Sequence, residues 1–313
     1  MKVANIWSAF GRKMAAWQHG RAVRHILDTP PIVPKGDGVI LFSMIGTAVL
    51  LPYLLAVKSL HAQLQRGRVV LLDDGTLTDA DKAILDHHVG NPVILAFADI
   101  DTSPCPKGNC WERLLAILDL RREHYVIQLD SDTVTLGPVP EIRSAIMDNR
   151  SFTLGGGVEE VEHGFMTVPQ MISEIYPDGP LFPHIQSVIE AALRDVPGAD
   201  DMKYIRGCAG FAGFSQSVGG RALAERFATD VGRVVGPRFN EWGSEQAASN
   251  FVIANDPDPI QLPYSRYTNH WEEPLPPNPA FIHYIGTYRY NRGSYVTSTK
   301  RAIRQLRQNK SSS

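Results

Sequence analysis

Two aspartates, Asp130 and Asp132, stand one residue apart directly after an apolar run, in the stretch YVIQLDSDTVTLG. Burying two like charges at a strand end without a counter-charge costs several kcal/mol. A divalent cation removes that cost, because Mg²⁺ and Mn²⁺ accept carboxylate oxygens and complete their coordination with water and phosphate oxygens. The pair therefore predicts a metal site that holds a phosphate-bearing ligand, with simple capping of the strand end as the alternative.

The spacing alone is not specific, because other aspartates in the chain have the same gap. These other pairs stand where a helix start or a loop is expected: Asp79/Asp81, Asp99/Asp101 and Asp256/Asp258. Asp130 and Asp132 differ in their context, since an apolar strand precedes them and three strand–helix units come before that strand. This context favours the metal site over a chance spacing.

The elements that must position these carboxylates alternate regularly along the first half of the chain. Apolar runs predict strands at 39–44, 68–73, 92–100 and 125–129, and helical periodicity predicts helices at 51–64, 79–88 and 111–122. Continuous apolar strands are covered on both faces, which predicts an α/β fold with a largely parallel sheet flanked by helices. Ligands of such sheets bind at the carboxyl ends of strands, where Asp73 and Asp74 also fall.

Bulk composition limits the classes of protein to consider. The chain has 313 residues and a net charge of -2, which argues against a nucleic-acid binder, whose phosphate contacts need a basic excess. Three cysteines without zinc-like spacing predict a reducing compartment, and no secretory signal is evident, so a cytoplasmic location is expected. The apolar stretch 39–60 is interrupted by polar residues, glycine and proline and predicts a strand, a loop and a buried helix instead of a membrane span.

Both ends of the chain are basic. Positive side chains recur in 12–24 and again in 300–310. Two interpretations remain open: solvated helix faces, or peripheral adhesion to an anionic membrane surface or an anionic lipid-linked substrate on the inner face of a membrane.

Two segments give the chain a family resemblance. LDSDTV resembles the D-x-D motif of nucleotide-sugar glycosyltransferases of the GT-A fold, and FIHYIGTYR resembles the late H-x-x-G-x-[KR] segment of glycosyltransferase family 8. The resemblance implies that Asp130, Asp132 and His283 bind Mn²⁺ or Mg²⁺, and that Gly286 and Arg289 contact the diphosphate, with Asp130 also facing the donor. Such an enzyme takes a nucleoside diphosphate sugar, here expected to be a UDP-sugar.

Weaker similarities extend the expected site. CAGFAGFS stands beside the family's N-A-G-[VF] strand, with Cys208 where asparagine is usual, and GSEQAASN stands beside its D-Q-D-x-x-N segment. By this resemblance Glu245 is the candidate base of an inverting enzyme, and Gln246 would lie under the anomeric centre of a retaining one. A plain helix-capping pair is the alternative for both.

Other candidates face the nucleotide or the acceptor. The run DDG after the second strand resembles a turn of inverting GT-A enzymes in which an aspartate contacts the base, so Asp73 or Asp74 has this role or forms an Asx turn. Ser43, at the end of the first strand, should face the nucleoside by topology. Four aromatic side chains could form an acceptor platform or anchor loops: Trp242, Tyr267, His270 and Trp271.

The expected organisation is one domain with appended ends. Residues 1–35 form an N-terminal helical extension, 36–145 the nucleotide-sugar-binding half, 146–295 the acceptor-binding half and 296–313 a basic C-terminal helix and tail. The expected acceptor is a glycan, a lipid-linked sugar or another glycoconjugate.

Three other classes compete with the transferase. A phosphatase of the haloacid dehalogenase type would use Asp130 as nucleophile, but Asp200, Asp201 and Lys203 stand in the wrong order and lack a preceding strand. A nucleotidyltransferase would need a glycine-rich loop with a basic residue after the first strand, and this loop is missing after 39–44. A non-catalytic GT-A-like binding protein is expected to lose the metal ligands, which this chain keeps.

Overall fold

The computed structural model describes residues 2–271 and 273–308, with side chains from residue 10 onward. The predicted polar tail at 309–313 lies outside the described residues. The chain divides into two compact units, and both are discontinuous in sequence. Unit 1 comprises Met1–Leu95, Leu129–Arg143 and Ser265–Ser313, and unit 2 comprises Ala96–Gln128 and Ser144–Tyr264. The expected boundaries at residues 35, 145 and 295 stay predictions.

Unit 1 contains the first strand–helix alternation and a small second sheet. Strands β1 (Val39–Ile45) and β2 (Arg68–Asp73) pair in parallel, and β3 (Val93–Ala96) follows β2 in the sheet order. A three-stranded sheet has the order β11-β12-β5. The bounds of its strands and of the unit's helices are β5 Thr133–Thr135, β11 Tyr267–Asn269, β12 Phe281–His283, α1 Lys2–Val23, α2 Leu50–Leu64, α3 Asp79–Val89 and α11 Ser294–Gln308.

The sequence predicts most of these elements well, with two corrections. The predicted strand at 92–100 is shorter, because the chain turns into a 3-10 helix at Phe97–Asp99 directly after β3. The predicted helix at 79–88 exists as α3, but its N-cap is Thr78 and not Asp79. Thr78 and Asp81 form a reciprocal capping box, which gives Asp81 of the Asp79/Asp81 pair a structural role without a ligand.

The apolar stretch around α2 is a core element of unit 1. Among the described residues, one helical stretch, Thr47–Leu64, is long and apolar enough to cross a membrane, and 61% of it is buried inside the protein. Lys58 of α2 is buried as well, and its Nζ lies 3.0 Å from His88 Nδ1. Burial lowers the pKa of three histidines of this unit, His19, His61 and His88, to about 4.

Unit 2 contains the other strands and most of the remaining helices. Its strands have the order β10-β6-β9-β4, with β10 parallel and β9 antiparallel to β6. Strand β4 leads out of unit 2 into unit 1, and α5 leads back. The bounds are α4 Trp111–Leu120, β4 Tyr125–Leu129, α5 Pro140–Met147, β6 Phe152–Gly155, α6 Val158–His163, β7 Phe165–Thr167, α7 Val168–Ile175, α8 Ile185–Ala192, β8 Lys203–Ile205, β9 Gly207–Phe214, α9 Ala222–Val235, α10 Ser244–Ala254 and β10 Ile260–Gln261.

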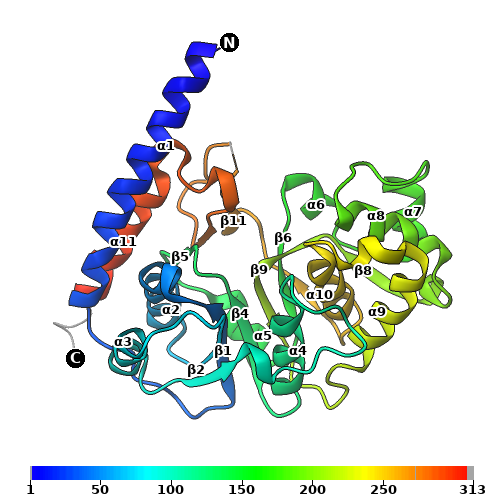
Figure 1. The fold of residues 1–313 in the computed structure, drawn as a ribbon, viewed down its shortest axis with the longest axis horizontal. Helices are drawn as coiled ribbons and strands as arrows, with labels where there is room; N and C mark the ends of the chain where they lie inside the picture. The colour runs from blue at the N-terminus through cyan, green and yellow to red at the C-terminus, as the bar shows by residue number, and fades with distance from the viewer. Residues whose placement is uncertain (1, 272, 309–313) are drawn as a thin grey trace. The chain divides into compact units, whose positions relative to one another are not determined.

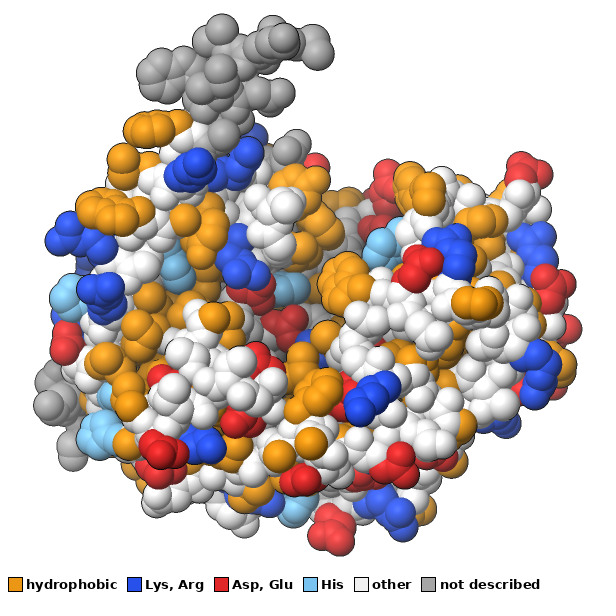
Figure 2. Space-filling model, viewed as in Figure 1, with side chains coloured by type: hydrophobic (Ala, Val, Ile, Leu, Met, Phe, Trp, Pro, Cys, Tyr) orange, Lys and Arg blue, Asp and Glu red, His pale blue; other side chains and the backbone are white. Residues whose placement is uncertain are grey.

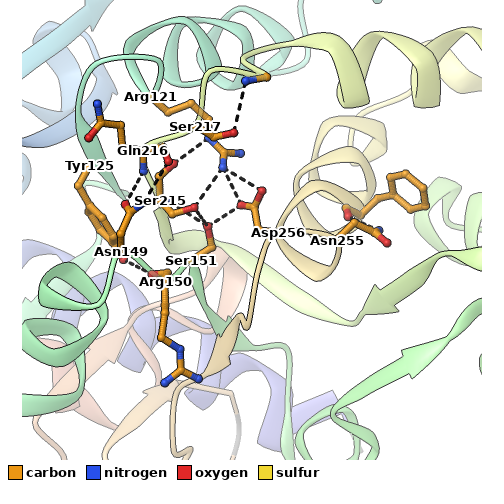
Figure 3. Close-up of polar contacts among 12 residues, drawn as sticks. Arg121, Tyr125, Asn149, Arg150, Ser151, Ser215, Gln216, Ser217, Asn255 and Asp256 are labelled. Carbon is orange, nitrogen blue, oxygen red and sulfur yellow. Dashed lines mark hydrogen bonds and ion pairs between the residues drawn. The ribbon is translucent and has the colours of Figure 1, made fainter.

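A buried polar network ties four elements of unit 2 together (Figure 3). The Arg121 guanidinium, after α4, donates to both Asp256 carboxylate oxygens at 2.9 and 2.8 Å and to the backbone oxygen of Ser215. Ser151, before β6, donates to Asp256 at 2.5 Å and accepts from the Ser215 backbone N–H. Asp256 therefore balances a buried arginine, so the Asp256/Asp258 spacing has a structural explanation.

Candidate metal centre

The strand end that carries the two aspartates is fixed by hydrogen bonds within unit 1. Ser43 of β1 is 2% exposed, and its hydroxyl donates to the Leu129 carbonyl at 2.6 Å. The Thr133 hydroxyl donates to the Asp130 carbonyl at 3.0 Å, which closes the turn before β5. Asp132 is buried and Asp130 is half-buried. The Asp-Ser-Asp turn is therefore preorganised on a rigid strand end.

A distant segment of the chain brings a histidine to this turn. Strand β12 pairs antiparallel with β5, so that His283 stands opposite Thr133, the residue after Asp132. One ligand atom from each of Asp130, Asp132 and His283 lies within 4.8 Å of the others. The structure thus brings together the three residues that the resemblance assigned to the metal.

The orientation of the histidine ring is set by Asn269. This residue lies on β11 opposite His283, and its Oδ1 accepts from His283 Nδ1 at 3.0 Å. Because Nδ1 carries that proton, Nε2 is the nitrogen left to face Asp132, whose Oδ1 is 3.3 Å away. Asn269 was not among the sequence candidates. Its only sequence signal is its place in the short polar run TNH before an aromatic residue.

Arg289 lies closer to the aspartates than the resemblance suggested. Its guanidinium donates to Asp132 Oδ2, and its Nε donates to the Tyr284 carbonyl at 3.2 Å. Burial alone would raise the pKa of the Asp132 carboxyl, but His283 and Arg289 outweigh it and hold the pKa below its usual value. Asp132 is therefore an anion in the folded protein, in contact with the His283 imidazole and the Arg289 guanidinium.

These residues fit a divalent cation. The donor set contains two carboxylates and an imidazole whose other ring nitrogen donates to Asn269, which is how protein sites commonly hold Mn²⁺ or related ions. Asp130, Asp132 and His283 supply these ligands, with Asp130 half-buried and the other two buried. The group supports use of a divalent metal without selecting which one.

Gly286 follows β12 in a short 3-10 turn. Its φ is +38°, a value that side chains disfavour, and a Cβ at this position would meet no atom within 4 Å. The backbone here is thus both open and conformationally suited to glycine, which is compatible with the close approach of a phosphate. The contact with a diphosphate stays a prediction.

The turn after β2 has the Asx geometry that was the alternative for its two aspartates. Asp73 Oδ1 accepts from the Gly75 backbone N–H at 2.8 Å, and Asp74 Oδ1 accepts from the Thr76 backbone N–H at 3.0 Å. A Cβ on Gly46 would lie 2.2 Å from Asp74 Oδ1, so the ends of β1 and β2 approach closely. Both aspartates thus have structural roles, and a contact with a nucleotide base stays a prediction, as it does for the buried Ser43.

The candidate catalytic residues lie in unit 2, in the first turn of α10. Glu245 is buried, and its Oε2 is 3.0 Å from the Arg113 guanidinium. Gln246 donates to Gln186 at 2.7 Å and accepts from the Ala209 backbone N–H at 3.3 Å. These contacts give both side chains a structural function. Their roles in catalysis stay predictions.

The four aromatic candidates for an acceptor platform divide into two kinds. Tyr267 and His270 are buried, and the Tyr267 hydroxyl donates to Glu141 at 2.6 Å, so neither ring face is available to a sugar. Trp242 is 68% exposed in unit 2, and Trp271 is half-buried in unit 1 against Tyr288. The platform prediction is therefore wrong for Tyr267 and His270, which anchor their strand.

Comparison with known proteins gives structural matches but no sequence match. Neither a protein-family model nor a curated protein matches the chain. The galactosyltransferase LgtC, solved with donor and acceptor sugar analogues, aligns with 87% of this chain and 95% of its own at a TM-score of 0.50 and 13% identity. The glycosyltransferase GlyE of Streptococcus pneumoniae TIGR4 aligns at a TM-score of 0.54 and 13% identity over 89% of this chain and 64% of its own. The chain has the GT-A fold.

The GT-A fold confirms the predicted fold class and the place of the aspartates. Asp130 and Asp132 follow β4, where that fold carries its D-x-D motif. The rival phosphatase arrangement is not formed, because Asp200 and Asp201 stand in a 3-10 turn and Lys203 begins β8 of an antiparallel pair. The solved structures compared above are glycosyltransferases, although at such low identity the likeness itself extends only to the fold.

Proposed function

We propose that this GT-A protein is a metal-dependent glycosyltransferase. It takes a sugar from a nucleoside diphosphate sugar, with a UDP-sugar as the first candidate, and transfers it to a glycan or another glycoconjugate. The observation that carries the proposal is the grouping of Asp130, Asp132 and His283, with ligand atoms within 4.8 Å, at the end of the strand where the fold binds its donor. The first cofactors to test are Mn²⁺ and Mg²⁺.

In this proposal the bond between the anomeric carbon and the diphosphate oxygen breaks, and its electron pair leaves with the nucleotide. Asp130, Asp132 and His283 would hold a divalent cation, which would supply positive charge to stabilise the leaving diphosphate. The acceptor hydroxyl oxygen forms the new bond to the anomeric carbon, and its proton passes to a base. Glu245 is the proposed base if configuration inverts, and Gln246 the proposed neighbour of the anomeric centre if it is retained.

The residues of unit 1 have separate tasks in this scheme. Asp130, Asp132 and His283 would hold the cation, and Asn269 keeps the His283 ring in place through its 3.0 Å hydrogen bond. Arg289 contributes a fixed cation beside the same site, since its guanidinium contacts Asp132. A positive charge placed before the reaction where negative charge will develop lowers the barrier without reorganisation.

The test is calorimetric titration of the purified protein with UDP, with and without Mn²⁺. We expect binding only in the presence of Mn²⁺, followed by slow hydrolysis of one UDP-sugar in a donor screen. Asp132→Asn and His283→Ala should abolish the metal-dependent binding. Asp79→Asn is the matched control, because Asp79 is the exposed member of an aspartate pair of the same spacing, and the variant should leave binding unchanged.

The outcomes separate the transferase from its rivals. If UDP, GDP and the other nucleoside diphosphates all fail to bind with Mn²⁺ or Mg²⁺, the proposal is overturned. If the wild-type protein hydrolyses simple phosphate esters instead, the phosphatase class replaces it. Nucleotide binding without turnover of any donor sugar would support a GT-A-like binding protein.

A further inference from the structure

Helix α1 carries an outward face that the rest of unit 1 leaves exposed. Its buried residues, among them Ala15, His19 and Ala22, point toward the protein. Phe10 and Trp17, spaced seven residues apart, fall on the opposite side of the helix and are 58% and 57% exposed. Large apolar side chains on the side of a helix that faces away from the core indicate a surface that meets something other than water.

The same face carries a cation, Arg21. Arg21 lies over the Trp17 ring with its guanidinium carbon 4.9 Å from the ring centroid, and Met14, 41% exposed, lies between Phe10 and Trp17. Met14, with Phe10, Trp17 and Arg21, completes the set that we call the basic–aromatic face. In the sequence from residue 2 to 24 every charged side chain is lysine or arginine. The whole chain has a net charge of -2, so this cation density is local.

Helix α11 enlarges this surface. It packs beside α1 (Figure 1). The two helices enclose a groove of about 600 Å³, whose basic lining includes Arg21, Lys300, Arg304 and Arg307. No acidic residue occurs in α11. Figure 2 shows lysine, arginine and hydrophobic side chains interleaved over this part of unit 1.

The groove is held in place by specific contacts. Arg307 pairs with Asp28, after α1, at 2.7 Å, and His19 of α1 stacks on Tyr295 of α11 with ring centroids 3.9 Å apart. Trp17 and Ile303 supply apolar lining between the cations. A fixed surface that alternates cations with exposed aromatic and aliphatic side chains has the composition of helices that lie in a membrane interface.

We propose that the basic–aromatic face of α1, together with the groove beside α11, docks the protein on an anionic membrane surface. Phe10, Met14 and Trp17 enter the boundary between headgroups and acyl chains, and Arg21, Lys300 and Arg304 contact lipid phosphates. Charge complementarity selects this occupant, because an apolar protein partner would offer these three cations no counter-charge. This inference is independent of the proposed transferase activity.

Vesicle flotation tests the proposal without donor, acceptor or metal. The wild-type protein should float with phosphatidylcholine vesicles that contain about one-third phosphatidylglycerol, and not with pure phosphatidylcholine vesicles. High salt should release it, because near 1 M salt charges are screened over about 3 Å. Lys300→Glu/Arg304→Glu should weaken binding at least about 25-fold, since each cation at an anionic surface contributes about fivefold.

Two further variants make the test specific. Phe10→Ser/Trp17→Ser removes the inserted side chains at exposed positions and should also abolish flotation. Lys107→Glu/Arg233→Glu changes the net charge by the same amount on exposed residues of unit 2 and should bind as the wild type does. All variants should keep the wild-type melting temperature, because every changed side chain is at the surface.

Three results would overturn the proposal. One is a wild-type protein that floats with neither kind of vesicle. Another is equal binding to both kinds with no effect of Lys300→Glu/Arg304→Glu. The third is a combination of two observations: Phe10→Ser/Trp17→Ser dissociates a concentration-dependent dimer of the wild-type protein, and the same variant still binds vesicles. The face would then bind a second copy of the chain instead of a membrane.

Discussion

The hydrogen bond between Asn269 and His283 should govern metal affinity although Asn269 is not a ligand. Both residues are buried, and Asn269 Oδ1 accepts from His283 Nδ1 at 3.0 Å. In Asn269→Leu this Nδ1 proton loses its acceptor in a buried site, which costs about 1–3 kcal/mol. The ring avoids that cost only by rotating, and rotation moves Nε2 away from Asp132.

Whether the His283 ring stays in place with an unpaired proton or rotates, Asn269→Leu should bind the metal more weakly. Loss of the hydrogen-bond partner of a metal-binding histidine weakens metal binding by about 10- to 100-fold. This corresponds to about 1.4–2.8 kcal/mol and agrees with the penalty for the unpaired proton. Asn269→Asp restores an acceptor and adds a negative charge beside the imidazole. That variant should bind Mn²⁺ at least as tightly as the wild type does.

The assay is titration of the free protein with Mn²⁺, read by the loss of the free-ion electron paramagnetic resonance signal. Asn250→Ala is the matched control, because Asn250 is a buried asparagine of unit 2 that donates to the Gly207 carbonyl at 3.1 Å. It should lose stability but keep its Mn²⁺ affinity. If Asn269→Leu and Asn269→Asp both bind Mn²⁺ like the wild type, the orienting role of Asn269 is refuted.

Three further predictions concern stability, each measured by urea unfolding. Arg121→Met leaves the Asp256 carboxylate without its partner in the buried network of unit 2 and should lower the free energy of unfolding by about 3–5 kcal/mol. The double variant Arg121→Met/Asp256→Leu should lose less, and an equal loss would contradict the pairing. Gly46→Ala pushes a Cβ against Asp74 and should cost about 1–3 kcal/mol, whereas a neutral effect would show that the turn can yield. Because the three buried histidines of unit 1 have a pKa near 4, the unfolded chain binds protons first as the pH falls from 6.5, so stability should decline down to about pH 4. His61→Leu should reduce that decline by up to about 3 kcal/mol. An unchanged dependence of the unfolding free energy on pH would contradict the conclusion that His61 is neutral in the folded protein.

The sequence predicts the strand–helix alternation and the Asp-Ser-Asp turn because both depend on residues that are neighbours in the chain. The run at 125–129 is apolar except for Gln128, which is close to what a strand covered on both faces requires, and it coincides with β4. The short strands of unit 1 carry no such signal. Three residues suffice for β5, β11 and β12, and their pairing depends on contacts between distant segments.

The metal-site residues show the same division between local and distant information. Asp130 and Asp132 can be predicted from the chain itself, whereas His283 could be assigned only through the family resemblance. Asn269 was missed because its importance depends on the parallel register that sets it opposite His283. The contact of Arg289 with Asp132 likewise appears only when the turn after β12 is folded. Sequence patterns identify ligand types, and tertiary register decides which neighbours orient them.

The order of synthesis gives the discontinuous unit 1 a consequence of its own. In sequence, 157 residues separate Asp132 from Arg289. At typical ribosome speeds Arg289 is therefore made about 8–30 s after the aspartate turn. During this interval the two like-charged aspartates have neither His283 nor Arg289 beside them, so the native metal centre can close only after β12 has left the ribosome.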